Sequence, residues 1–168
     1  ILSHFEIEIP NRISRIKSNE RTEDPQALEK YMRGFQAMEV AKSQDDLEKV
    51  KNLFKGAFEL DIHFIDAHAQ YAVTCSKLGN FEEAESILKK SLNIAEKNKD
   101  EESMAYVFNL MGFIYNSWNK YDQAKYIFKK GLEIQLELDY RIQESKILNG
   151  LSGAYNGIGD SNLAKDYQ

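Results

Sequence analysis

The sequence contains very little cysteine, proline or glycine. Its one cysteine, Cys75, cannot form a disulfide within the chain, which fits a reducing compartment, and we expect the cytoplasm. The 168 residues include only 2 prolines and 9 glycines. Few residues therefore interrupt a helix, and the composition favours long helices.

Long apolar runs and an excess of positive charge are also absent. No apolar run approaches the roughly 20 residues that a membrane-spanning helix needs. The formal net charge is −5, and no basic stripe of the kind found in duplex-binding proteins is present. We therefore expect neither membrane insertion nor nucleic-acid binding. The chain begins ILSHFEIEIP, without Met or an intact signal peptide, so we expect a fragment of a longer protein or a processed N-terminus.

The second half of the sequence repeats with a period of 40 residues. Residues 109–124 read NLMGFIYNSWNKYDQA, and residues 149–164 read NGLSGAYNGIGDSNLA. An alanine recurs at one place in three copies, at Ala84, Ala124 and Ala164. Five residues before it, each copy has a residue suited to a tight turn with positive φ: Gly79, Asn119 and Gly159. A more divergent copy precedes these three and aligns Val50 with Ala84.

Each copy has the pattern of two helices joined by a short turn. In the third copy an apolar stripe with spacings of three and four runs through Phe108, Met111 and Tyr115, and a second stripe follows the turn at 119–120. The small side chains of the recurring alanine and of Gly112 allow two helices to cross closely. The patterns predict helices over about 25–42, 47–60, 65–78, 81–97, 102–117, 121–138 and 141–157, and another from about 161.

Residues 1–23 differ from the repeats. Phe5, Ile7 and Ile9 alternate with Glu6 and Glu8, a period of two that predicts extended structure. We expect this segment to be a linker or the tail of a preceding domain. The first helix should start after it, with Asp24 as its cap and a proline at its first position.

The repeat resembles the tetratricopeptide repeat. Each unit has a small residue at the eighth place, and three have Gly or Asn at the fifteenth and Ala at the twentieth. Two units have Tyr at the eleventh place, and two have an aromatic residue at the seventeenth. The resemblance covers about residues 28–168 and implies an all-α, right-handed α-solenoid of antiparallel helix pairs. The units are expected at 24–62, 63–101, 102–141 and 142–168, the last one truncated. This sequence departs from the family in lacking Pro after the second helices and in having His68, Phe108 and Leu148 where Trp is usual.

The sequence shows no convincing catalytic or metal-binding constellation. His63 and His68 are five residues apart, whereas a helical zinc pair needs a spacing of four. Cys75 lies on a buried stripe, at a place where the repeat usually has Tyr, so we expect a core thiol. The glycines at 157–160 follow no strand, which favours a turn over a phosphate loop. We therefore expect a non-catalytic chain without a cofactor or a metal.

In tetratricopeptide arrays, the fifth, ninth and twelfth places of the first helices face a concave groove. Carried over residue by residue, this implies a partner groove in the present chain. It would include Tyr31, Phe35, Val73, Ser76, Asn109, Phe113, Asn116, Asn149 and Asn156.

The groove would contain a ladder of asparagines. Asn109 and Asn116 are seven residues apart and share one helical face, and Asn149 and Asn156 repeat that spacing. A carboxamide can pair with both the N–H and the C=O of a bound peptide. The same amides could instead cap loops, bond neighbouring helices or face water.

The resemblance implies a non-catalytic module that binds a protein or peptide segment. Residues 24–61 are similar to the first repeat of the tetratricopeptide tail in some bacterial class III nucleotidyl cyclases and related signalling regulators. This similarity suggests the regulatory or scaffolding part of a larger bacterial protein. The long units also resemble bacterial peptide-pheromone receptors, so a peptide sensor is an alternative, and self-association through exposed array ends is another. The chaperone-tail clamp is not expected, because Tyr31 and Phe35 occupy the places of its Lys and Asn.

Overall fold

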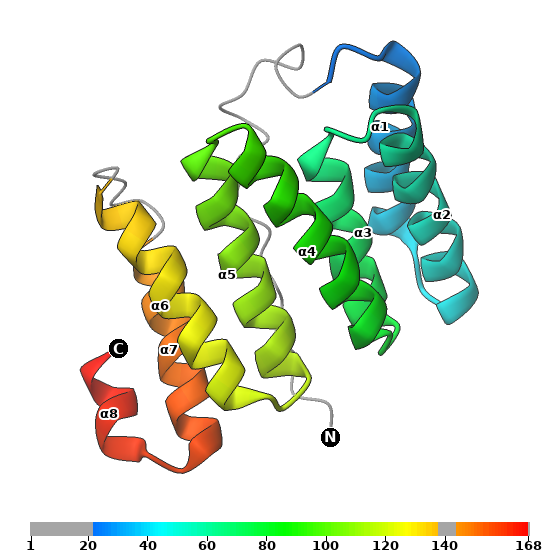
Figure 1. The fold of residues 1–168 in the computed structure, drawn as a ribbon. Helices are drawn as coiled ribbons and strands as arrows, with labels where there is room; N and C mark the ends of the chain where they lie inside the picture. The colour runs from blue at the N-terminus through cyan, green and yellow to red at the C-terminus, as the bar shows by residue number, and fades with distance from the viewer. Residues whose placement is uncertain (1–21, 138–143, 168) are drawn as a thin grey trace.

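The protein is a stack of antiparallel helix pairs (Figure 1). The computed structural model describes residues 22–137 and 144–167. Within them, the chain forms α1 (Pro25–Val40), α2 (Gln44–Leu60), α3 (Ile65–Lys77), α4 (Phe81–Lys97), α5 (Glu101–Ser117), α6 (Tyr121–Glu137), α7 (Glu144–Ile158) and α8 (Ser161–Asp166). Each helix packs against the next one along the chain. The predicted all-α solenoid of helix pairs is therefore confirmed.

The first two helices begin at side-chain caps. The carboxylate of Asp24 accepts hydrogen bonds from the backbone N–H of Gln26 at 2.8 Å and of Ala27 at 3.0 Å, and Pro25 takes the first helical position, as predicted. The second helix starts at Gln44, before the predicted start at about 47.

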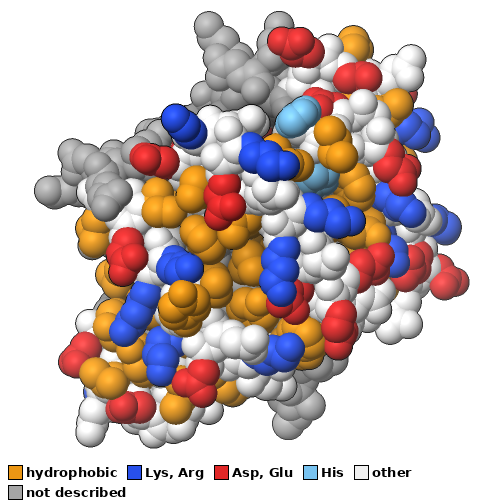
Figure 2. All heavy atoms as spheres, in the orientation of Figure 1, with side chains coloured by type: hydrophobic (Ala, Val, Ile, Leu, Met, Phe, Trp, Pro, Cys, Tyr) orange, Lys and Arg blue, Asp and Glu red, His pale blue; other side chains and the backbone are white. Residues whose placement is uncertain are grey.

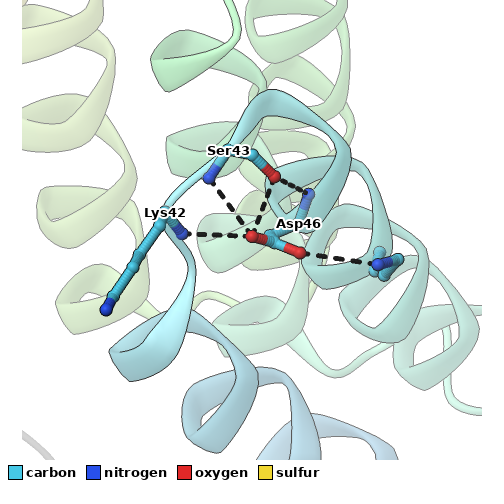
Figure 3. A network of polar contacts seen from close by, with 4 residues as sticks. Lys42, Ser43 and Asp46 are labelled. Carbon is cyan, nitrogen blue, oxygen red and sulfur yellow. Dashed lines mark hydrogen bonds and ion pairs between the residues drawn. The ribbon is translucent and has the colours of Figure 1, made fainter.

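The early start of α2 has a local cause, shown in Figure 3. Ser43 Oγ accepts from the N–H of Asp46 at 3.1 Å, while Asp46 Oδ2 accepts from the backbone N–H groups of Ser43 and Lys42, both at 3.2 Å. The hydrogen bonds from the Ser43 side chain and the Lys42 backbone hold the pKa of Asp46 below its usual value. This reciprocal capping box brings residues 44–46 into the helix.

Four helices end in the same type of turn. In each, one residue has positive φ: Gly79 (80°), Lys99 (52°), Asn119 (59°) and Gly159 (89°). The N–H of the following residue donates to a carbonyl five residues back, at distances of 2.8 to 2.9 Å. This pattern is a Schellman motif, which uses carbonyls left unpaired at a helix end. The sequence predicted positive φ at Gly79, Asn119 and Gly159, but not at Lys99.

Large and small side chains are matched inside the units. A Cβ added to Gly34 would lie 2.6 Å from the ring of Phe54, and one added to Gly112 would lie 2.6 Å from the ring of Phe128. Both phenylalanines are completely buried. Glycine therefore lets a phenylalanine of the second helix fill the space beside the first.

The first helices of successive units form one layer. α3 contacts α5 and α5 contacts α7, whereas α2, α4 and α6 show no comparable contact with one another among the described residues. Because, within the described residues, the first helices contact one another more than the second helices do, the stack curves toward the layer of first helices. We call this side, formed by α1, α3, α5 and α7, the inner face. Within the described ranges, no helix is long and apolar enough to cross a membrane.

The described chain begins beside the turn between α2 and α3. Thr22 Oγ1 donates to Asp61 Oδ2 at 2.5 Å, and Asp61 Oδ1 accepts from the N–H of His63 at 2.9 Å. The extended structure predicted for residues 5–9 and the predicted helix ends within 138–143 lie outside the described residues.

Candidate functional site

Four of the predicted groove residues are buried, and three of them are Tyr31, Val73 and Ser76. Tyr31 and Val73 are 2% and 1% exposed, and Ser76 is also buried. The ring of Tyr31 lies 4.7 Å from that of Phe64 and 4.9 Å from that of Phe35, measured between centroids. Tyr31 is therefore a core residue where α1 meets the next unit.

Phe35 and Phe113 are partly accessible. Phe35 packs edge-on against Phe54, and Phe113 packs edge-on against Phe128, with centroid distances of 5.6 and 5.0 Å. Each ring is anchored on the core phenylalanine of its own unit while part of its surface stays accessible. A fixed, partly exposed aromatic ring can receive an apolar side chain of a partner.

Two of the four asparagines, Asn109 and Asn116, contact neighbouring helices, and the other two are exposed. Asn109 is buried, and a Cβ added to Gly131 in α6 would lie 2.7 Å from its Oδ1. Asn116 Nδ2 donates to the carbonyl of Gly150 in α7 at 2.9 Å. For Asn116 the structure thus shows a bond to a neighbouring helix, one of the alternatives open from the sequence. Asn149 and Asn156, both on α7, are exposed.

The buried histidine is a packing residue. The Ser91 hydroxyl donates its single hydrogen to the carbonyl of Ile87 at 3.0 Å. Ser91 Oγ therefore acts as the acceptor toward His68, whose Nδ1–H donates to it, also at 3.0 Å. Burial lowers the pKa of His68 to about 4, with partial compensation by the charge of Asp61. Because Ser91 is completely buried, a substrate cannot reach it, and the pair cannot serve as a hydrolytic dyad.

A polar network that the sequence did not predict joins α2, α3 and α4. Tyr71 OH donates to Glu83 Oε1, and Lys51 Nζ lies 2.9 Å from Glu48 and 3.6 Å from Glu83. Burial raises the pKa of the neighbouring Cys75 to about 12, so its reactive thiolate form is scarce. The residues of the polar network come from three helices and do not recur at a fixed sequence spacing. No sequence pattern therefore marks the network.

Among the described residues, no group of three or more His, Cys, Asp and Glu side chains could hold a metal ion. Figure 2 shows the side on which α4 and α6 lie in front. Basic and acidic side chains are interspersed there, so this side carries no stripe of one charge.

Comparisons with known proteins agree with the helix-pair architecture. Residues 64–137 match the family model described as tetratricopeptide repeat. A search of curated proteins finds no match. Among solved structures, the chain is similar to the apo form of RapI, with a TM-score of 0.64 and 18% sequence identity. The alignment covers 94% of this chain and 43% of that one, so the chain spans less than half of the RapI chain.

Proposed function

Residues 64–137 carry tetratricopeptide repeats, and from this premise we propose that the chain is a non-catalytic module that binds a protein or peptide segment on its inner face. The observation that carries the proposal is the layer arrangement. The first helices lie together on one side, and the partly accessible groups of the predicted groove belong to these helices. They are Phe35 on α1, Phe113 and Asn116 on α5, and Asn149 and Asn156 on α7.

These groups suit an extended segment with apolar anchors. Phe35 and Phe113 offer ring surface to apolar side chains, and the exposed amides of Asn149 and Asn156 offer both donors and acceptors to a peptide backbone. Recognition of backbone groups and a few apolar anchors allows several related sequences to bind. We therefore propose a regulatory or scaffolding role within a larger cytoplasmic bacterial signalling protein.

A displayed library of random peptides of about 12 residues tests the proposal, since this length suffices for an extended or helical ligand. Selected peptides are measured by fluorescence anisotropy against the whole chain and against an Asn149→Arg variant, whose larger side chain would obstruct the inner face. We expect at least about a tenfold loss of affinity, which corresponds to roughly 1.4 kcal/mol.

The matched control for this experiment is Tyr126→Ala. Tyr126 lies on α6, outside the inner face, and is 58% exposed. Peptides that bind the Tyr126→Ala variant as tightly as the unmodified chain support the proposal. Loss of binding in Tyr126→Ala together with full binding in Asn149→Arg would move the site to the outer layer.

A further inference from the structure

The junction between α4 and α5 holds a carboxylate beside a tyrosine and a lysine. Tyr115 OH donates to Glu85 Oε1 at 2.9 Å, and Lys89 Nζ lies 2.5 Å from the same oxygen. Although burial acts in the opposite direction, the hydrogen bonds from Lys89 and Tyr115 hold the pKa of Glu85 below its usual value. This arrangement therefore stabilises a charged carboxylate.

A second carboxylate is held in the same way where α2, α3 and α4 meet. Tyr71 OH donates to Glu83 Oε1, and Lys51 Nζ lies 3.6 Å from Glu83 Oε2. The hydrogen bond from Tyr71 and the charge of Lys51 hold the pKa of Glu83 below its usual value. The positions on both sides of α4 thus combine a phenol, an ammonium group and a carboxylate.

The next position along the array, at α6, α7 and α8, repeats the phenol and the lysine but not the carboxylate. Three residues lie forty positions after the glutamate, lysine and tyrosine of the α4–α5 junction, and they are Lys125, Lys129 and Tyr155. A lysine therefore replaces the glutamate. Two periods after Glu83 the chain has Leu163, which is not an acid either. We call Lys125, Lys129 and Tyr155 the lysine–tyrosine cluster.

Both lysines of the cluster lie against the ring of Tyr155. Lys125 Nζ is 5.5 Å and Lys129 Nζ is 5.9 Å from the ring centroid. Tyr155 is only 6% exposed and stacks on Tyr167, with a centroid distance of 5.3 Å and an interplanar angle of 6°. The stacking holds the phenol in place beside the two ammonium groups.

The positive charge of the cluster is incompletely paired. Lys125 Nζ lies 3.2 Å from Asp122 Oδ1 on the same helix, and pairs of this kind at the surface contribute little. A hydrogen bond with the Tyr155 hydroxyl, not a carboxylate, raises the pKa of Lys129, which forms no ion pair among the described residues. Lys129 is exposed, so a carboxylate from outside can reach it.

We propose that the lysine–tyrosine cluster binds a glutamate or aspartate side chain of a partner segment, at the position that Glu85 takes beside Tyr115. Both filled positions contain a glutamate of a protein helix, which favours a protein carboxylate as the ligand. The site lies on α6 and α7, outside the predicted groove, so the inference goes beyond the proposed function.

The chemistry of the cluster suits such a ligand. Lys129 can only donate, so the hydroxyl hydrogen of Tyr155 remains available for a carboxylate oxygen. The ammonium groups of Lys125 and Lys129 supply the opposite charge. Hydrogen bonds assisted by charge are roughly twice as strong as neutral ones.

Titration of the whole chain with a short acidic peptide, followed by amide NMR shifts, tests the proposal. The probe is a pentapeptide with blocked ends and one glutamate between pairs of alanines, and the same peptide with glutamine is the uncharged control. We expect saturable shifts around Lys129 and Tyr155 with the glutamate peptide. The glutamine peptide should bind at least about tenfold more weakly, and acetate, which lacks the flanking chain, at least about threefold more weakly.

Substitutions in the chain locate the bound carboxylate. Lys129→Gln should weaken binding of the glutamate peptide at least about tenfold, whereas Lys90→Gln, which removes an exposed lysine of α4, should leave it unchanged. Leu163→Glu places an acid where the repeat has Glu83 beside Lys51. It should therefore compete for the cluster and weaken peptide binding at least about fivefold, while Leu163→Gln should keep the affinity.

The proposal fails if the glutamate peptide gives no saturable shift near the cluster, if the glutamine peptide binds equally well, or if Lys129→Gln leaves the affinity unchanged. Acetate that binds as tightly as the peptide would indicate a free small carboxylate instead of a partner segment. The Asn149→Arg variant, which obstructs the inner face, should keep its affinity for the glutamate peptide. A loss of affinity in that variant would place the acid in the groove of the proposed function rather than at the cluster.

Discussion

At the scale of single residues, a glycine on the first helix of a unit leaves space for a large side chain on the second helix. Gly34 faces Phe54 and Gly112 faces Phe128, with no space for a methyl group in either pair. The places of these pairs in the second unit are taken by Ala72 and Leu88, both buried. A larger residue on the first helix thus accompanies a smaller one on the second, and the volume of the pair is kept.

Introducing the second unit's pair into the first tests this compensation. Gly34→Ala alone should destabilise the chain by about 1–3 kcal/mol, because the new methyl group overlaps the Phe54 ring. Phe54→Leu in the same chain should recover at least about 1 kcal/mol relative to the sum of the single changes. Urea unfolding of the four proteins measures the coupling, and additive effects would refute the compensation.

Gly56→Ala is the matched control for Gly34→Ala. An added methyl group there meets only the flexible side chain of Lys30, at 3.1 Å. The change should be tolerated and should stabilise α2 by up to about 1 kcal/mol through helix propensity.

His68 makes the stability of the fold sensitive to acid. Its pKa is about 4 in the folded chain, compared with a usual value of 6.5. As the pH falls through the interval between these values, the unfolded chain takes up a proton that the folded chain does not. Stability is therefore complete above about pH 6.5 and is lost progressively towards pH 4.

Between pH 7.5 and pH 5, this effect should lower the free energy of unfolding by about 2 kcal/mol. A His68→Gln variant should lose less stability than the unmodified chain over the same interval, and His63→Gln, at an exposed position, should behave like the unmodified chain. Urea unfolding at both pH values gives the comparison. An identical pH dependence in the unmodified chain and the His68→Gln variant would rule out this role for His68.

At the scale of elements, the helix ends decide where each unit turns. Three of the four Schellman turns have Gly or Asn at the residue with positive φ, while the turn between α4 and α5 has Lys99. A lysine in this conformation is strained because of its Cβ, whereas glycine is not.

Lys99→Gly should therefore stabilise the chain by about 1 kcal/mol, because it removes that strain. Lys97→Gly, in the last turn of α4, is the matched control and should destabilise by up to about 1 kcal/mol. The two thermal midpoints should move in opposite directions. A lower midpoint for Lys99→Gly would show that the lysine side chain contributes more than its strained backbone costs.

Most elements could be predicted from the sequence, because helices and turns leave local signals. The apolar period of three and four gave the helices, and Gly79, Asn119 and Gly159 gave three turns. Lys99 carries no turn signal, and the Ser43–Asp46 capping box was missed because its acid is Asp rather than the commoner Glu.

The candidate site was less predictable, because it depends on contacts between distant elements. The repeat places assigned Tyr31 and Val73 to a groove, yet both side chains are buried. Burial depends on tertiary contacts, which a repeat position does not specify. The contacts of Asn109 and Asn116 depend on Gly131 and Gly150, which lie in other helices. Glycines at those places were the only available signal, since they mark sites of close approach.

At the scale of the whole molecule, a side-chain hydrogen bond and close packing connect the last unit to the rest. Asn116 of α5 donates to a backbone carbonyl of α7, and α7 also approaches closely through Gly150, whose Cβ would lie 2.4 Å from the Phe128 ring. The last unit thus depends on α5 and α6 for its position.

Asn116→Ala should weaken this connection by about 1 kcal/mol, the net contribution of a typical hydrogen bond. Amide hydrogen exchange should accelerate in α7 and α8 while α1 to α4 keep their rates. Ser117→Ala, at the adjacent exposed position, is the control and should leave both groups unchanged. Uniform acceleration along the chain would contradict a local role for Asn116.

Amide chemical-shift mapping with a library-selected peptide tests most directly whether the inner face receives a partner segment. We expect the shifted signals to cluster on α1, α3, α5 and α7, around Phe35, Phe113 and Asn149. Shifts concentrated on α2, α4 and α6 would contradict it and would place the binding surface on the outer layer.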